Sequence, residues 1–218
     1  MTGLEAWGAV VLGPMPGGAR SRLWRVEVEG RLCVARQVRA GEPSLRWLAR
    51  LQAVATREGL CLAPMIPSRS GALTVGGWTV EPWLDGLPGN ATDLGEVRHG
   101  LRRMHRATRV WPARPGLVRR LPLRLAAPAA QVSAVHGDVH AGNVLRLAGG
   151  SLALIDWEEA RIGDPQLDLG FERDAAGRAA HAASEAAACW WVEPDRARAM
   201  ARMVRLSGAR PQRPSCIR

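Results

Sequence analysis

Residues 136–145 read HGDVHAGNVL, and residues 155–158 read IDWE. The first stretch holds Asp138 and Asn143 five positions apart, among glycines and short side chains that are typical of a loop. The second places Asp156 directly after an apolar run, thirteen residues beyond Asn143. We therefore expect a loop that carries an Asp and an Asn, followed at the end of a strand by a second Asp.

These residue types, in this order, suit phosphoryl transfer. Transfer from a nucleoside triphosphate to a hydroxyl needs a carboxylate that accepts the hydroxyl proton, and oxygen ligands that hold Mg²⁺ across the phosphates. The spacing matches the catalytic loop H-R-D-x-x-x-x-N with its downstream metal-binding Asp. Any one of these residues alone is typical of an ordinary turn, whereas the combination favours a catalytic site.

Composition sets outer limits on the fold and the location. The chain has 218 residues, 47% of them hydrophobic, which suits one domain or two small lobes with a substantial core. It has no run of about 18 apolar residues and no basic start typical of a signal peptide, so we expect a cytoplasmic protein without a membrane partner. The four cysteines are scattered without C-x-x-C pairing, which predicts reduced thiols.

Charge is distributed unevenly along a strongly basic chain. All 30 basic residues are arginines, and the segment between Glu96 and Asp138 contains arginines but no acid. This segment suggests a weaker alternative function, the binding of nucleic acid or another polyanion. Since no nucleic-acid motif is present, we expect no specific nucleic-acid partner. Retention on heparin at rising salt would distinguish a polyanion-binding protein from a kinase.

Patterning predicts a strand-rich first third. Apolar runs and alternation, separated by glycine and proline, indicate five strands: 7–12, 23–29, 31–38, 73–75 and 78–83. Glu29 and Gly30 mark a hairpin turn. Leucines at helical spacing predict a helix that begins at Ser44 and ends near Glu58, and a loop is expected over 84–90.

The remainder reads as mainly helical. Thr92 or Asp93 can cap a helix whose apolar stripe continues to Met104. Two short apolar runs, 133–135 and 152–155, flank a Gly-Gly pair and predict a buried hairpin. Two further helices are expected, over 175–192 and 195–206.

The two signatures resemble those of the aminoglycoside phosphotransferase and choline kinase-like family of small-molecule kinases. Residues 136–145 are similar to its H-G-D-x-H-x-G-N-x-L form, and residues 155–169 to its I-D-W-E…G-D-P…D-L form. The resemblance implies an α+β, two-lobed protein-kinase-like fold. Its expected parts are a β-rich nucleotide-binding lobe over 1–80, a hinge over 81–90, a mainly helical catalytic lobe over 91–206 and a basic, disordered tail over 207–218.

The resemblance also implies a role for each residue of the signatures. Asp138 resembles the catalytic base, Asn143 and Asp156 the Mg²⁺ ligands, and His136 the residue that supports the catalytic loop. Asp168 resembles an acid that braces this loop from behind. The implied reaction is Mg²⁺-dependent transfer of the γ-phosphate of ATP or GTP to a hydroxyl of a small molecule.

Candidate nucleotide contacts lie upstream. Gly17 and Gly18 lack a Cβ and so allow the main chain to approach the phosphates, although a plain hairpin turn is an equal alternative. Arg36 stands where kinases place a phosphate-pairing lysine, and arginine is bulkier and geometrically less forgiving there. Glu81 and Trp83 resemble a hinge that reads adenine through its backbone, while Trp83 could equally belong to the core.

The first helix departs from the family pattern. It lacks a central acid that would clamp Arg36, since Glu42 precedes the predicted helix and its middle carries arginines. This departure leaves open a rearranged phosphate clamp, a weakly active enzyme, or a pseudokinase that binds nucleotide without transferring phosphate.

A metal-hydrolase site is a weaker alternative for the same loop. The loop has a possible metal ligand at every second position: His136, Asp138 and His140. No further His or Cys stands at a spacing that would complete a metal site. The other histidines are expected to be isolated surface or packing residues: His99, His105 and His181.

The acceptor is the least specified part of the site. Acids in the C-terminal helices would favour a cationic hydroxylated acceptor, such as an aminoglycoside or an amino alcohol. The more ordinary interpretation is a set of solvated helix faces balanced by neighbouring arginines. The acids concerned are Glu172, Asp174, Glu185, Glu193 and Asp195.

Overall fold

The computed structural model divides the chain into two compact units. It describes residues 2–15, 21–116, 132–169, 182–183, 186 and 194–206. The first unit comprises Met1–Gly100, Arg114–Leu117 and Ala141–Asp156, and the second comprises Leu101–Ala113, Val118–His140 and Trp157–Arg218. The lobe limits expected at residues 80 and 90 stay a prediction.

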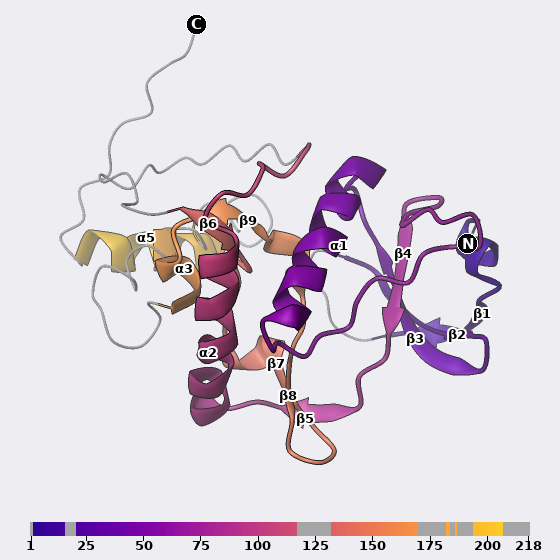
Figure 1. The fold of residues 1–218 in the computed structure, drawn as a ribbon, viewed down its shortest axis with the longest axis horizontal. Helices are drawn as coiled ribbons and strands as arrows, with labels where there is room; N and C mark the ends of the chain where they lie inside the picture. The colour runs from indigo at the N-terminus through magenta and orange to yellow at the C-terminus, as the bar shows by residue number, and fades with distance from the viewer. Residues whose placement is uncertain are drawn as a thin grey trace, which may run out of the picture. The chain divides into compact units, whose positions relative to one another are not determined.

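A four-stranded antiparallel sheet forms the amino-terminal part of the first unit (Figure 1). Its strands, in spatial order, are β1 (Val10–Pro14), β2 (Leu23–Val28), β3 (Arg31–Gln37) and β4 (Trp78–Pro82). Glu29 and Gly30 have positive φ angles of 50° and 74°, as the predicted hairpin turn between β2 and β3 requires. The strand expected over 73–75 is not formed, because Val75 makes only an isolated bridge with Trp78.

The two faces of this sheet differ in chemistry. Cys33 and Ala35 of β3 and Val80 of β4 join a buried core with the short helix η1 (Leu4–Trp7). Because side chains alternate along a strand, Arg36 of β3 and Glu81 of β4 lie on the opposite face. The alternation therefore places a charged pair on a rigid sheet.

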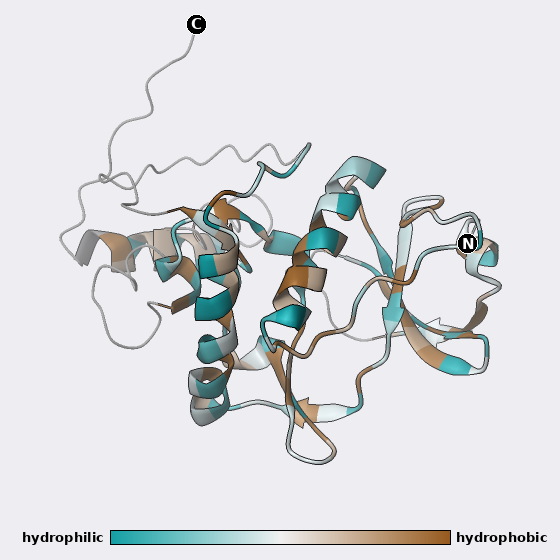
Figure 2. Cartoon of the chain, viewed as in Figure 1, coloured by the Kyte–Doolittle hydropathy of each residue, from teal (hydrophilic) through white to brown (hydrophobic). Residues whose placement is uncertain are grey.

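Helix α1 (Glu42–Arg57), which carries both hydrophilic and hydrophobic residues along its length (Figure 2), begins two residues before the predicted start. Gly41 is its N-cap and a proline occupies its first turn, where the missing N–H costs nothing. Ser44 is therefore not the cap; it is buried, and its hydroxyl accepts a hydrogen bond from Arg114 Nε at 2.8 Å. Glu42 lies inside the first turn of the helix rather than before it.

Helix α2 (Ala91–Ala107) has a reciprocal cap that the sequence analysis assigned to the wrong residue. The Asn90 side chain accepts the N–H groups of Thr92 at 2.8 Å and Asp93 at 3.2 Å. The Asp93 carboxylate accepts the Asn90 N–H at 2.9 Å and pairs with Arg146. Asn90 is thus the N-cap, and neither Thr92 nor Asp93 is.

The predicted hairpin between 133–135 and 152–155 is wrong. In the first unit, the order β5-β7-β8 forms an antiparallel sheet from Gly86–Pro88, Val144–Leu147 and Leu152–Leu154. In the second unit, β6 (Ser133–Val135) pairs with β9 (Arg161–Gly163). Short apolar runs identify strands but not their partners. In addition, β5 lies within the segment 84–90, which was expected to be a loop.

Four short or terminal elements complete the described chain: η2 (Ala141–Asn143), η3 (Trp157–Glu159), α3 (Gln166–Leu169) and α5 (Pro194–Leu206). Most of the helix expected over 175–192, and the tail over 207–218, lie outside the described residues. None of the described helices is both long enough and apolar enough to cross a membrane.

Candidate active site

The open end of the β7–β8 hairpin brings the two predicted metal ligands onto neighbouring backbone. Asn143 ends η2 directly before β7, and Asp156 follows β8 after one residue, Ile155. The Ile155 N–H donates to the Asn143 carbonyl at 2.9 Å, which extends the pairing beyond the hairpin ladder. Closure of this hairpin is the physical reason why residues thirteen positions apart in sequence meet in the first unit.

Asp156 has the features of a carboxylate that is held for a ligand. Its φ angle is +64°, a left-handed conformation that costs energy for a residue with a Cβ. Its Oδ1 atom is buried and accepts no hydrogen bond from the described residues, although Arg36 Nη1 lies 3.2 Å away. A buried carboxylate oxygen is costly unless a cation or a donor compensates it. Together with the amide oxygen of Asn143, this donor set fits a hard cation such as Mg²⁺.

Arg36 lies between two acids. Its guanidinium is 3.2 Å from Asp156 Oδ1 and 3.6 Å from Glu81 Oε1. Glu81 is a diagonal neighbour of Arg36 across the β3–β4 pair, so the acid that the first helix lacks is supplied by β4. Glu42 of α1 is instead engaged with the backbone N–H groups of residues 73–74. Glu81 was expected in the hinge, and its contact with Arg36 is revealed only by the strand register.

Trp83 lies at the edge of the sheet and not in the core. It is half-buried, and the Arg25 guanidinium lies over its ring at 5.2 Å from the centroid. Its N–H donates to the Leu32 carbonyl at 3.0 Å, so this backbone donor is already used within the protein. Gly17 and Gly18 fall between β1 and β2, outside the described residues. The hinge and the phosphate loop stay predictions.

In the second unit, a buried carboxylate holds the first half of the 136–145 loop. Asp168 of α3 is fully buried, and its two oxygens accept the N–H groups of His136 and Gly137, each at 2.8 Å. His105 Nε2 lies 2.8 Å from Asp168 Oδ2. These contacts match the bracing role that the family resemblance implies for Asp168. They also correct the expectation that His105 is isolated.

Asp168 is ionised in spite of its burial. Burial alone would raise the pKa of this carboxyl, but the hydrogen bond from His105, the electrostatic interactions with His105 and His136, and the Gly137 N–H lower it. The net result is a pKa below the ordinary value for Asp. The brace therefore depends on a charged carboxylate surrounded by donors.

The backbone of Asp138 is held by His136. Its N–H donates to His136 Nδ1 at 3.3 Å, while its Oδ1 lies 3.8 Å from His140 Nε2, beyond hydrogen-bonding distance. His136 is fully buried, and its ring meets the Trp157 ring edge-on, with centroids 4.7 Å apart. The buried imidazole thus fixes the position of the Asp138 backbone.

The hydrolase interpretation of the loop finds no support. No group of three or more His, Cys, Asp or Glu side chains among the described residues could hold a metal ion. His136 uses Nδ1 to accept the Asp138 N–H, which removes that nitrogen as a metal ligand. The predicted phosphotransfer residues are divided between the units, with Asp138 in the second and Asn143, Asp156 and Arg36 in the first.

Comparison with known proteins finds similarity to phosphotransferases in both sequence and fold. Residues 110–214 match the model of the phosphotransferase enzyme family. No curated protein sequence matches the chain. Among solved structures, the choline kinase LicA from Streptococcus pneumoniae aligns with a TM-score of 0.62 at 12% identity, covering 91% of this chain and 94% of that one.

Two further solved structures share the same fold. An aminoglycoside phosphotransferase from Alicyclobacillus acidocaldarius gives a TM-score of 0.57 at 17% identity, covering 95% of this chain and 85% of that one. A spectinomycin phosphotransferase in complex with ADP and spectinomycin gives 0.55 at 12% identity, covering 92% of both chains. The predicted resemblance and the α+β protein-kinase-like fold are therefore confirmed.

Proposed function

We propose, from the family match over 110–214 and the kinase-like fold, that this protein transfers the γ-phosphate of ATP or GTP to a hydroxyl group of a small molecule. The observation that most supports this proposal is the environment of the Asp156 carboxylate. Its buried oxygen, which accepts no hydrogen bond from the described part of the chain, its left-handed backbone and its contact with Arg36 suit a carboxylate that binds a cation beside phosphates. ADP in the spectinomycin phosphotransferase supports a nucleotide donor.

Arg36 is proposed to bind the phosphates of the nucleotide. A guanidinium can make paired hydrogen bonds to phosphate oxygens, and Glu81 limits its freedom from the neighbouring strand. Gly17 and Gly18 would cover the phosphates with backbone N–H groups, and Glu81 and Trp83 would border the adenine or guanine. In this arrangement Arg36 moves from Asp156 to the phosphates when nucleotide binds.

Asn143 and Asp156 are proposed to hold Mg²⁺. A bound Mg²⁺ would supply positive charge that offsets the negative charge developing during transfer. The contribution of the chain is to present the two oxygens from the open end of the β7–β8 hairpin, on backbone linked by the hydrogen bond from Ile155. The left-handed turn at Asp156 directs this carboxylate, and its cost is offset by the ligand that it holds.

Asp138 is proposed to accept the proton of the acceptor hydroxyl. The hydroxyl oxygen forms a bond to the γ-phosphorus, and the bond between that phosphorus and the bridging oxygen to the β-phosphate breaks. The nucleoside diphosphate leaves, and the hydroxyl proton moves to the Asp138 carboxylate. His136 and Asp168 act as positioning residues, since they hold the backbone on which Asp138 stands.

The proposed acceptor is a small hydroxylated molecule, with a cationic one favoured. Choline kinase and aminoglycoside phosphotransferases are among the proteins that share the fold. Of the acids named for the acceptor wall, only Asp195 is described, and it is 96% exposed and paired with Arg198 at 2.9 Å. That acid fits the solvated helix face better than an acceptor contact.

A thermal-shift titration tests the nucleotide site. ATP and GTP would each be added to wild type, Asp156→Asn and Asp195→Asn, with and without Mg²⁺. A ligand that binds only the folded state raises its stability, so wild type and Asp195→Asn should show a Mg²⁺-dependent shift that Asp156→Asn lacks. Absence of any shift at millimolar nucleotide would refute the proposed donor site.

A pseudokinase is the second candidate, because Arg36 replaces the usual lysine and its described acid partner on the sheet comes from β4 instead of α1. The two candidates share nucleotide binding and differ in turnover. A screen of hydroxylated acceptors with radiolabelled ATP separates them. Transfer that is lost in Asp138→Asn supports the kinase, and Mg²⁺-dependent binding without any transfer supports the pseudokinase.

A further inference from the structure

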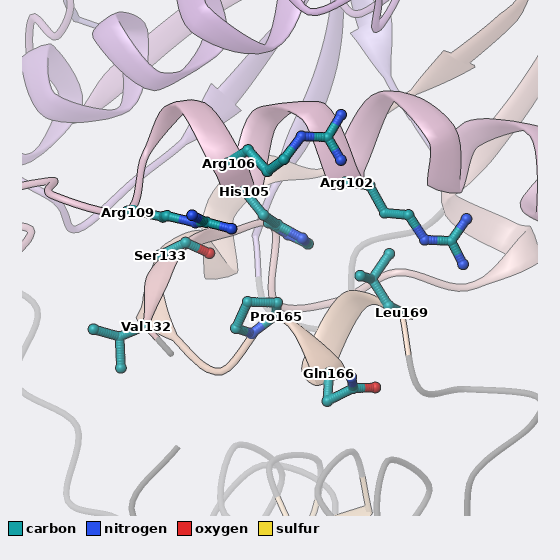
Figure 3. A pocket seen from close by; sticks show the side chains of 9 residues that line it. All are labelled: Arg102, His105, Arg106, Arg109, Val132, Ser133, Pro165, Gln166 and Leu169. Carbon is teal, nitrogen blue, oxygen red and sulfur yellow. The ribbon is translucent and has the colours of Figure 1, made fainter. Parts of the chain in front are cut away.

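A pocket of about 280 Å³ lies within the second unit, on the side of His105 that faces away from helix α2 (Figure 3). The carboxyl-terminal part of α2 with the turn after it, the start of β6 and the α3 segment form its walls. The lining residues are Arg102, His105, Arg106, Arg109, Val132, Ser133, Pro165, Gln166 and Leu169. None of the residues proposed for phosphoryl transfer is among them.

Three arginines give the pocket a concentrated positive charge. Arg102, Arg106 and Arg109 are spaced by four and three residues, which places them on one side of the helical turn. Among the described residues, no acidic side chain lines the pocket and no ion pair joins any of the three arginines to another side chain. Like charges at these helical spacings repel one another, and a bound anion would relieve this repulsion.

Apart from the arginines and His105, the lining residues are two polar and three apolar side chains. Ser133 and Gln166 offer a hydroxyl and an amide, while Val132, Pro165 and Leu169 form an apolar wall. A volume of about 280 Å³ accommodates a compact organic molecule. The lining therefore fits a ligand that joins an anionic group to a small apolar body.

A buried imidazole connects this pocket with the catalytic loop. His105 is 4% exposed, and Figure 3 shows its ring extending from the helix between Arg102 and Arg109. Its Nε2 contacts Asp168, whereas its Nδ1 is buried and has no hydrogen-bond partner among the described residues. An unpartnered polar atom at this depth is an independent sign that the pocket is built for a polar ligand.

We infer that this pocket is a second anion site, which binds a small phosphomonoester. Three guanidinium groups match a doubly charged phosphate better than a single carboxylate, because each can donate paired hydrogen bonds to its oxygens. The site is distinct from the proposed nucleotide site and does not depend on it. Its occupant would contact His105, which supports the catalytic loop through Asp168.

Isothermal titration of the full chain with phenyl phosphate, against phenol, tests this inference. The variants are Arg106→Gln with Arg109→Gln, and the control Arg31→Gln, which removes an exposed arginine from β3. Wild type should bind phenyl phosphate saturably and phenol not at all. The double variant should bind at least about tenfold more weakly, since each lost charged hydrogen bond is worth more than 1.4 kcal/mol. The control should stay within about twofold of wild type.

A further variant, Arg36→Gln, separates this inference from the proposed function. Binding that is lost in Arg36→Gln and kept in the double variant would overturn the inference and place the probe in the nucleotide site. Absence of saturable binding, or equal weakening in every variant, would also overturn it. The Mg²⁺-nucleotide titration depends on Asp156 and not on Arg106 or Arg109, so either proposal can fail while the other stands.

Discussion

Asp156 and Asp168 stand twelve residues apart in the same signature, yet the structure treats them in opposite ways. Asp168 is fully buried and accepts two backbone N–H groups, with His105 as a third partner. The Asp156 side chain is 37% exposed, but its Oδ1 atom is buried with no hydrogen bond from the residues that the structure describes, and its backbone is left-handed.

The difference distinguishes a carboxylate that stabilises the fold from one that we propose binds a ligand. A carboxylate whose oxygens are saturated with donors has no capacity left for a metal ion, and its removal leaves those donors buried and unpaired. A carboxylate that is strained and incompletely partnered gives up little stability when it is replaced, but it can bind a cation. Stability and ligand binding should therefore respond oppositely to substitution at the two positions.

The largest expected effect is on the free energy of unfolding of Asp168→Ala. The substitution leaves the N–H groups of His136 and Gly137 and the His105 imidazole without their common acceptor, which should cost about 3–5 kcal/mol. Asp156→Ala should stay within about 1 kcal/mol of wild type. Urea unfolding measures both variants, and equal losses at the two positions would abolish the distinction.

Asp138→Asn should lower turnover by about 10²–10⁴-fold and leave nucleotide affinity nearly unchanged, because only the proton acceptor is removed. His140→Gln is the matched control, since His140 contacts Asp138 only loosely, at 3.8 Å. Steady-state transfer to an acceptor identified by screening measures the effect. Wild-type turnover in Asp138→Asn would refute the assignment of Asp138 as the base.

Gly137→Ala tests whether the backbone at Gly137, which donates its N–H to Asp168, tolerates an added Cβ. Gly137 has φ +85°, and an added Cβ would lie 2.7 Å from the Glu159 carbonyl oxygen. Gly149 is the control, because it has φ +87° and open space around the added Cβ. Both variants carry the strain of a positive φ, and we expect Gly137→Ala to lose roughly 1–3 kcal/mol more in urea unfolding. Equal losses would show that the close approach to Glu159 is unimportant.

Arg36→Gln should raise the KM for nucleotide by about tenfold, because it removes a charged hydrogen bond to phosphate. Arg31→Gln, on the same strand but exposed, is expected to change KM by less than about twofold. Initial rates at varied nucleotide give both values. If the two variants gave the same KM, Arg36 would be an ordinary strand charge.

The smallest expected effect is on how the stability of the fold depends on acidic pH when Asp168 is replaced. Since the pKa of Asp168 is lower in the folded protein than in the unfolded chain, its ionised form stabilises the fold. That contribution is fully present above the unfolded pKa of about 3.9 and is lost as the pH falls through the lower folded pKa. The difference in stability between wild type and Asp168→Asn should therefore narrow below about pH 4, as measured by urea unfolding. A constant difference down to pH 2 would contradict the role of the ionised carboxylate.

Local chemistry explains what could be predicted along the chain. The turn at Glu29 and Gly30 depends on two adjacent residues, so the pattern was sufficient to find it. Helix caps were harder: Gly41 and Asn90 were missed in favour of Ser44, Thr92 and Asp93, because several polar residues near a helix start compete for the same role. The partner of β6 was also missed, because apolar runs of three residues carry no information on pairing.

The sequence by itself determined which residues are candidates for the chemistry, because the spacing of Asp138, Asn143 and Asp156 within the two signatures is a local property of the chain. Tertiary structure alone decided how each acid is used. The partners of Asp168 lie 32 and 63 positions away in sequence, and Arg36 reaches Glu81 only through strand register. Hydrogen-bond saturation depends on donors brought from distant segments, and such contacts cannot be counted before the chain has folded.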